Sequence, residues 1–403
     1  MTVPAIEITS SILQEPLADS FILNDSSFGI LNTNKLGGLV DTVLDVPIRS
    51  MTITRGRSRQ LDRFTAGTAS IVFNNFDRKL DPLNTASPYY EGIVPRQRIK
   101  ITADEKPIFT GVINDWDIEY DITNWDVAVA SAADAFTVLS NFAFESAVTP
   151  VAESPADRLD WVLTEFNYQG DYDFLGGAST MGAYEVSAGT QALDYMFRVA
   201  RSDRSSLFTD AGGTLRLIGI YDKKPTSAVT FSDDGDGIPY RSLLNQYGDE
   251  LLYNRVVASS PAGTVAVEDA ESIAAFEVST LDLSDLLLNS TVGLTAVANA
   301  YLVLYAMPTV RFTGLSVELA GLSAADTQSI LSLDLTDQIT VRKSFATGTP
   351  VSVSQDLMIT GIRHRISPDS HVIEFSFDPS TFKEPFKLDD AVYGILNGDY
   401  VLG

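Results

Sequence analysis

Phe109-Thr-Gly-Val-Ile113 and Ile359-Thr-Gly-Ile-Arg363 share an apolar-Thr-Gly-apolar pattern, and this pattern decides the predicted fold. Alternating segments flank both, at 98–102 and 125–131 around the first and at 338–341 and 371–377 around the second. A glycine inside a strand marks a bulge or a bend. We therefore predict two related β units whose walls curve at Gly111 and Gly361.

Other segments of the first third also alternate apolar with polar residues, notably 51–54 and 68–74. Such alternation is typical of antiparallel strands that bury one face. The middle of the chain differs. Ser154-Pro155 starts a predicted helix with apolar residues at 159, 162, 163 and 166, and a second predicted helix opens near Ser187. Asp210-Ala-Gly-Gly213 then joins the two strands of a predicted hairpin.

The predicted fold is mainly β with an α+β insertion, and its two related domains are tube-like β-barrels or sandwiches. A chain of 403 residues is long enough for several domains. We expect an N-terminal extended arm (1–50), a first β-barrel domain (51–140), an α+β insertion (141–248), a second β-barrel domain (249–380) with a buried helix at 294–306, and a C-terminal arm (381–403).

Composition argues against most catalytic chemistry. The chain has no cysteine and only two histidines, His364 and His371, which leaves little for thiolate, zinc or histidine-based sites. We expect both histidines on the barrel surface. The acidic turn at 233–237 lacks the spacing of a calcium loop, and the alternating acids Asp115, Asp117 and Glu119 are typical of a solvent-facing strand. We predict no enzyme, no cofactor and no metal site.

The best candidate for a membrane-spanning segment is residues 292–310, which carry no charge. Polar residues interrupt this run and Pro308 closes it, so we expect a core helix and no membrane span. The N-terminus has no basic region followed by an apolar run, so no secretory signal is expected.

Two end segments repeat each other. Phe21-Ile-Leu-Asn-Asp-Ser-Ser-Phe-Gly-Ile-Leu-Asn32 returns as Phe386-Lys-Leu-Asp-Asp-Ala-Val-Tyr-Gly-Ile-Leu-Asn397 with seven of twelve positions identical. Segments that mix large apolar residues with Asn, Asp and Gly suit extended arms that order on a partner. The expected anchors of these assembly arms are Phe21, Leu23, Phe28, Ile30, Phe386, Leu388, Tyr393 and Ile395.

Basic residues concentrate between Arg55 and Lys100, where nine stand against four acids in a chain of net charge −25. The alternation of Arg55, Arg57 and Arg59 would place them on one face if their strand continues through Gly56. Together with Arg63 they form either a solvated face or a basic patch that docks an acidic neighbour.

The runs 53–62, 64–69, 74–78 and 80–84, and the terminal Leu388-Asp-Asp-Ala-Val-Tyr-Gly-Ile-Leu396, resemble minor tail proteins of siphophages that infect actinobacteria. The overall plan is similar to the trimeric hub proteins of phage baseplates. This resemblance implies two barrels per subunit, so that a homotrimer imitates a six-fold ring. The long arms at both ends depart from that plan.

The resemblance implies a structural tail-tip, or baseplate-hub, subunit that closes the tail tube and joins it to tip or receptor-binding proteins. Such a subunit is made in the host cytoplasm and carried in the virion. Its expected partners are copies of itself and the distal tail, tape-measure and other tip proteins. The acidic charge suits a channel that DNA crosses without specific binding. The alternatives are a host-facing carbohydrate-binding or cell-wall-degrading tail protein, and a hexameric distal tail ring.

Overall fold

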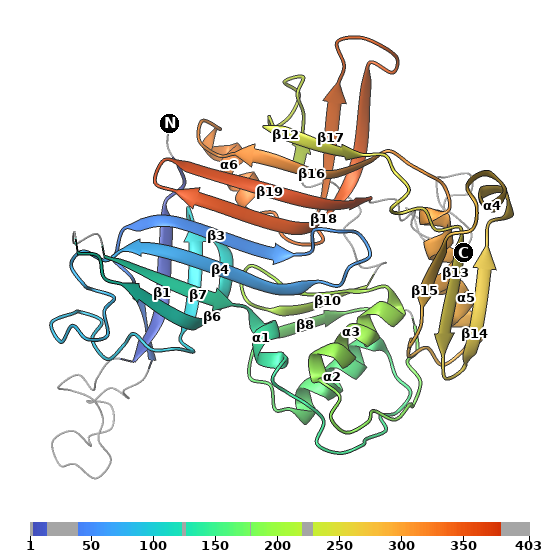
Figure 1. Cartoon of the computed structure of the whole chain (residues 1–403), viewed down its shortest axis with the longest axis horizontal. Helices are drawn as coiled ribbons and strands as arrows, with labels where there is room; N and C mark the ends of the chain where they lie inside the picture. Colours follow the sequence, from blue (N-terminus) through green and yellow to red (C-terminus); the bar gives the residue numbers. More distant parts are fainter. Residues whose placement is uncertain (1–2, 14–38, 123–125, 178, 220–228, 380–403) are drawn as a thin grey trace.

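The computed structural model describes residues 3–13, 39–122, 126–177, 179–219 and 229–379. One large sheet of 13 strands forms the body, and two three-stranded sheets with helices lie beside it (Figure 1). The predicted fold class, mainly β with an α+β part, is confirmed.

Five antiparallel strands form the frame of the first β unit. They are β3 (Ile48–Gly56), β4 (Thr65–Asn74), β5 (Arg98–Ala103), β6 (Lys106–Glu119) and β7 (Val127–Ala133). Their order in the sheet is β3-β4-β7-β6-β5, and β1 (Ile6–Leu13) and β2 (Leu39–Val43) continue it beyond β5. Residues 6–13 and 39–43, expected in an extended arm, are thus strands, because β1 extends the sheet by pairing along the edge of β5.

The second β unit repeats this arrangement. Its five strands are β12 (Ser242–Gln246), β16 (Arg311–Glu318), β17 (Gln338–Ser344), β18 (Ser352–Ser367) and β19 (Ser370–Pro379). Their order in the sheet is β12-β16-β19-β18-β17, which is the same permutation of chain order as in the first unit. Helix α6 (Ala324–Leu331) precedes β17, and β11 (Val229–Phe231) pairs with β17 in parallel. The two units are therefore topological duplicates.

Gly111 and Gly361 occupy the equivalent strands β6 and β18. Gly361 lies at a register shift between β18 and β19, where a strand bends. Gly111 lies just before the point at which β6 pairing passes from β5 to β7. A Cβ at Gly111 would stand 2.3 Å from the carbonyl oxygen of Ala133, and one at Gly361 would stand 2.4 Å from that of Arg57. Both positions therefore require glycine for close backbone approach.

The two units join through β3 and β18, which pair antiparallel from Gly56 with Gly361 to Met51 with Ile366. The result is a continuous run of antiparallel strands from β12 to β6. One face of this run is buried and carries apolar side chains such as Ile53, Ile71 and Phe375. The two histidines also lie on the buried side, so their predicted surface position is wrong.

The insertion contains α1 (Ala135–Leu139), α2 (Pro155–Glu165) and α3 (Ala192–Asp203) beside a sheet of β8 (Tyr172–Leu175), β9 (Ser206–Thr209) and β10 (Leu215–Ile218). Ser154 caps α2 as the sequence predicts, because its side chain accepts the Asp157 N–H. The hairpin β9–β10 turns at 210–213, also as predicted.

A third small unit follows the insertion at the right of Figure 1. It comprises β13 (Arg255–Ser260), β14 (Gly263–Glu268), α4 (Ala270–Phe276), β15 (Thr280–Leu283) and α5 (Thr291–Tyr305). These residues, expected in the second barrel, form their own sheet, whereas β12, expected in the insertion, pairs with β16. Helix α5 is only half-buried: Leu294 and Ala298 are covered, but Val303 is 85% exposed. The prediction of a buried helix is corrected, because α5 packs on one side of a small sheet and leaves its other side open.

Candidate functional site: the junction of the units and the open sheet face

The four arginines of the predicted basic patch are used inside the chain. Arg55 is buried, and Arg57 is largely buried beside Asp378, with which it forms an ion pair. Arg63 pairs with Asp194 of α3 at 2.7 Å, and Arg59 lies 3.8 Å from Glu250. Strand β3 ends at Gly56, whose φ is +89°, so the alternation does not continue as one strand face. The arginines therefore tie units together, and Arg55 cannot dock a neighbour.

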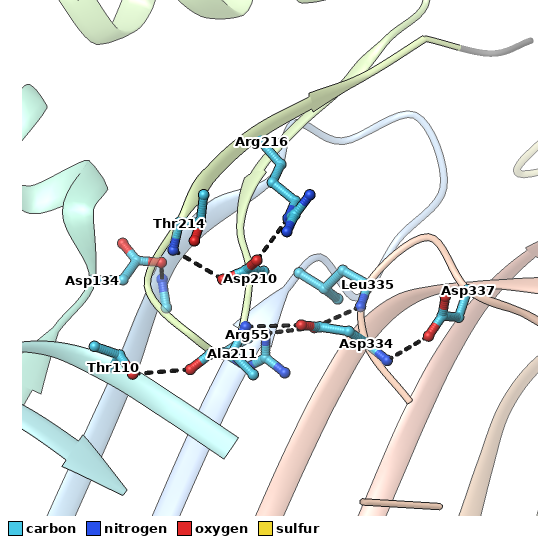
Figure 2. A network of polar contacts seen from close by, with 11 residues as sticks. Arg55, Thr110, Asp134, Asp210, Ala211, Thr214, Arg216, Asp334, Leu335 and Asp337 are labelled. Atoms are coloured by element: carbon cyan, nitrogen blue, oxygen red, sulfur yellow. Dashed lines mark hydrogen bonds and ion pairs between the residues drawn. The ribbon is translucent and has the colours of Figure 1, made fainter. Parts of the chain in front are cut away.

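Asp334, in the loop before β17, is the centre of the junction (Figure 2). Its carboxylate accepts hydrogen bonds from Arg55 of β3 at 2.7 Å and from the Ala211 N–H of the insertion hairpin at 2.8 Å. The same carboxylate accepts the Leu335 N–H, while the Asp334 N–H donates to Asp337. One carboxylate thus connects both β units and the insertion.

The hairpin loop 210–213 is positioned by both its backbone and its side chains (Figure 2). Asp210 accepts the Thr214 N–H at 2.9 Å and pairs with Arg216 at 2.6 Å. Thr110 of β6 donates to the Ala211 carbonyl at 3.0 Å. Gly213 has a φ of +91°, and a Cβ at this position would stand 2.8 Å from the Thr110 side chain, so the loop requires glycine here. The first Thr-Gly motif is therefore a contact point for the insertion.

The second Thr-Gly motif is a contact point as well. The Thr360 carbonyl accepts the Arg57 N–H at 2.8 Å, so the motif in β18 holds the chain where it leaves β3. Asp134, the residue after β7, supports the neighbouring strand β4, since it accepts the Gly67 N–H at 2.7 Å and caps α1. Burial raises the pKa of Asp134 to about 6, against the lowering effect of these N–H groups.

His364 and His371 face each other in the core between β18 and β19, with Nδ1 of the first 3.0 Å from Nε2 of the second. Burial is the main reason why the pKa of His364 falls well below its ordinary value and that of His371 falls to about 4. The pair is consequently neutral at pH 7, with one ring donating and the other accepting. Within the described residues the two rings bond to each other, and neither forms a hydrogen bond with a hydroxyl group.

The other candidate polar groups have structural partners. Asp233 forms an ion pair with Lys343 and accepts the Ser344 N–H, and Asp236 pairs with Arg342 at 2.7 Å. Within the ranges that the structure describes, no three metal-ligating side chains gather. In the same ranges no helix is long and apolar enough to cross a membrane. The predicted arm anchors at 21–30 and 386–395 lie outside the described residues.

The second face of the β12-to-β6 run is open and polar. Register places Glu374, Arg363, Thr54 and Thr68 in one row across β19, β18, β3 and β4. A neighbouring row runs from Arg365 through small hydroxyl residues to Asp115. The charged members of this face are Asp115, Asp117, Glu119, Glu318, Glu374, Arg363 and Arg365, so acids outnumber bases. This face crosses both β units without interruption, and the sequence alone gave no sign that it would.

No family model and no curated protein matches this chain by sequence. Solved structures do match. A tail protein from Neisseria meningitidis MC58 aligns with a TM-score of 0.60 at 10% identity, over 93% of this chain and 96% of that one. The 43 kDa tail protein of prophage MuSo2 from Shewanella oneidensis gives 0.57 at 12% identity, over 93% and 98%.

A third solved structure, prophage tail protein gp18 from Listeria monocytogenes EGD-e, aligns with a TM-score of 0.51 at 9% identity, over 93% of this chain and 95% of that one. At such low identity the likeness concerns the fold. Over nearly its whole length, this chain has the fold of phage and prophage tail proteins.

Proposed function

We propose that this protein is a structural subunit of the tail tip of a tailed bacteriophage, where three copies close into a ring around the DNA channel. The continuous open sheet face carries this proposal. A face that is polar, rich in small hydroxyl residues and spread over two duplicated units suits the wall of a wide tube. Its partners would be copies of itself and the distal tail, tape-measure and other tip proteins of the same virion.

Internal duplication suggests how the ring closes. Inside the chain, β3 pairs with β18 of the other unit. The equivalent of β3 is β12, which in the described chain pairs with β16 alone and is largely exposed. The equivalent of β18 is β6. On one edge of β6, pairing with β5 ends at Val112, so residues 114–119 of β6 have no described strand partner on that edge. We infer that β12 of one copy pairs with this part of β6 in the next, which repeats the internal junction.

Mass measurement of the assembled protein tests the ring directly. Three copies are expected, and six would favour the distal tail ring. Leu244 of β12 is 63% exposed, so Leu244→Asp would set a carboxylate beside Asp115 and Asp117 of the neighbour and weaken association by about tenfold or more. Leu83→Asp is the matched control, because Leu83 is also an exposed leucine, at 75%, but lies in the loop between β4 and β5. Equal association of both variants contradicts the proposed edge pairing.

The acidic balance of the open face suits DNA passage, since carboxylates repel phosphates and prevent adhesion to the wall. We expect rings of the natural protein to leave short duplex DNA unbound at low salt. Rings in which Asp115, Asp117 and Glu119 are replaced by lysine should retain DNA in a salt-dependent way. Retention of DNA by the natural ring would contradict a lumenal position for this face. Degradation of host cell wall by the purified protein would favour the enzymatic alternative.

A further inference from the structure

The hairpin of β17 and β18 extends beyond the sheet to which it belongs and stands out at the top of Figure 1. Pairing of β17 with β11 ends at Val341, and pairing of β18 with β19 begins only at Leu357. Among the described strands, residues 342–344 and 352–354 therefore pair only with each other. A two-stranded ribbon of this kind is marginally stable alone in water, so a neighbouring surface would stabilise it.

The end of this ribbon is ordered and apolar. The Phe345 N–H donates to the Val351 carbonyl at 2.8 Å, which continues the ladder by one pair. Directly opposed residues of a ribbon place their side chains on the same face, so Phe345 and Val351 lie together. They are 45% and 71% exposed. Two large apolar side chains at an exposed, ordered tip are typical of a contact with another protein surface.

The counterpart of this hairpin in the first unit has its partner inside the chain. Strands β5 and β6 are the counterparts of β17 and β18, because they hold the same places in the strand order. Their hairpin lies against α6 of the second unit, where the Gln328 side chain donates to the Asp104 carbonyl at 3.2 Å. Ile108 of β6 lines the same small cavity as Ile330 and Leu331 of α6. At the internal junction, the hairpin of one unit thus contacts the segment that precedes the third strand of the other.

The first unit carries an exposed apolar surface at the place that corresponds to α6. The segment before its third strand is the loop 75–97 between β4 and β5. Counted back from the strand that follows, residues 328–331 of α6 correspond to 88–91 of this loop. Tyr90 is 40% exposed, and Val94 is 42% exposed. The duplication therefore predicts that a hairpin of another copy contacts this part of the loop.

This part of the loop is held firmly. Tyr89 is buried, and its hydroxyl donates to the Val43 carbonyl at 3.3 Å and accepts the Asp45 N–H at 2.8 Å. A Cβ at Gly92 would stand 2.2 Å from a methyl carbon of Ile12, so the loop lies directly on β1. A surface that is already fixed loses little conformational entropy when a partner binds.

We propose that the tip of the β17–β18 hairpin docks on residues 88–94 of the next copy in the ring, with Phe345 and Val351 packed on Tyr90 and Val94. The contact rests on the proposed function, because pairing of β12 with β6 of the next copy would bring the two surfaces together as β3 and β18 do inside the chain. Docking removes apolar surface of both copies from water, which stabilises the ring. Leu83 lies earlier in the loop, outside the docking stretch.

Cross-linking between separate copies tests the contact, because the natural chain has no cysteine. Proteins that carry Val351→Cys and Val94→Cys are mixed, assembled and treated with a short bis-maleimide, and the linked peptides are identified by mass. We expect this pair to link about tenfold faster than Val351→Cys with Val303→Cys, since only docked residues have a raised effective concentration. Val303 is an exposed valine of α5, in the third small unit.

The outcomes separate the contact from the ring. Equal linking rates in a protein that forms rings would overturn the docking and leave the ring standing. A natural chain that stays monomeric at the concentrations used would overturn both.

Replacement of the tip tests how much the docking contributes to assembly. Phe345→Asp with Val351→Asp should weaken association about tenfold or more, because it would set two carboxylates against an apolar surface. Phe276→Asp with Val303→Asp is the matched control, because it changes the same residue types at exposed positions of the third small unit. Thermal unfolding curves verify that both variants are folded. Equal association of the two folded variants would refute the role of the tip.

Discussion

Removing the Asp334 carboxylate should destabilise the protein more than removing an equally short ion pair at the surface. The Arg55 side chain is only 3% exposed, so Asp334→Ala would leave a buried guanidinium and the Ala211 N–H without their acceptor. Breaking a buried pair costs about 3–5 kcal/mol. The Asp334 side chain is 27% exposed, so water moderates the loss and we expect about 2–3 kcal/mol. Spread over 403 residues, this lowers Tm by roughly 3 °C.

Calorimetry of the purified variants provides the measurement. Asp194→Ala is the matched control, because its pair with Arg63 is also 2.7 Å long but both side chains are more than half exposed. We expect at most about 0.5–1 kcal/mol from that control. The double variant Arg55→Met with Asp334→Leu should recover part of the stability, because it leaves no unpaired charge. Equal losses from Asp334→Ala and Asp194→Ala would refute a stabilising role of the Asp334 carboxylate at the junction.

Two further outcomes are expected. Because the pKa of the buried His371 falls from 6.5 to about 4, its contribution to stability is complete above pH 6.5 and lost as pH falls through 4. Urea unfolding between pH 7 and 4 should show a loss of about 3 kcal/mol that diminishes when both His364 and His371 are replaced by Gln, and an identical pH profile would contradict this assignment. Gly111→Ala and Gly361→Ala should each cost about 1–3 kcal/mol in the same assay, because the added Cβ meets a backbone carbonyl, whereas Gly248→Ala meets no atom within 4 Å and should be tolerated.

Local pattern predicted the local structure well. Alternation identified the central strands, and the Ser154-Pro155 start identified α2, because both signals depend on neighbours in the chain. The two Thr-Gly segments correctly identified a duplicated β unit, since each lies in the same strand of its copy. The predictions that failed concerned segments whose strand partner is distant in the chain. Residues of β12 were assigned to the insertion and those of β1 to an arm, but β12 pairs with β16 and β1 pairs with β5.

The sequence by itself determined that this protein is mostly β, duplicated, acidic, and without cysteine chemistry. Only the tertiary structure decided what its charges do. Arg55 and Asp334 are 279 residues apart in the chain, and no local rule pairs them. Likewise, whether a histidine such as His371 is exposed depends on which face of the sheet packs into the core. Strand register then placed the polar side chains of both units on one open face, because pairing across β3 and β18 aligns residues that the chain order keeps far apart.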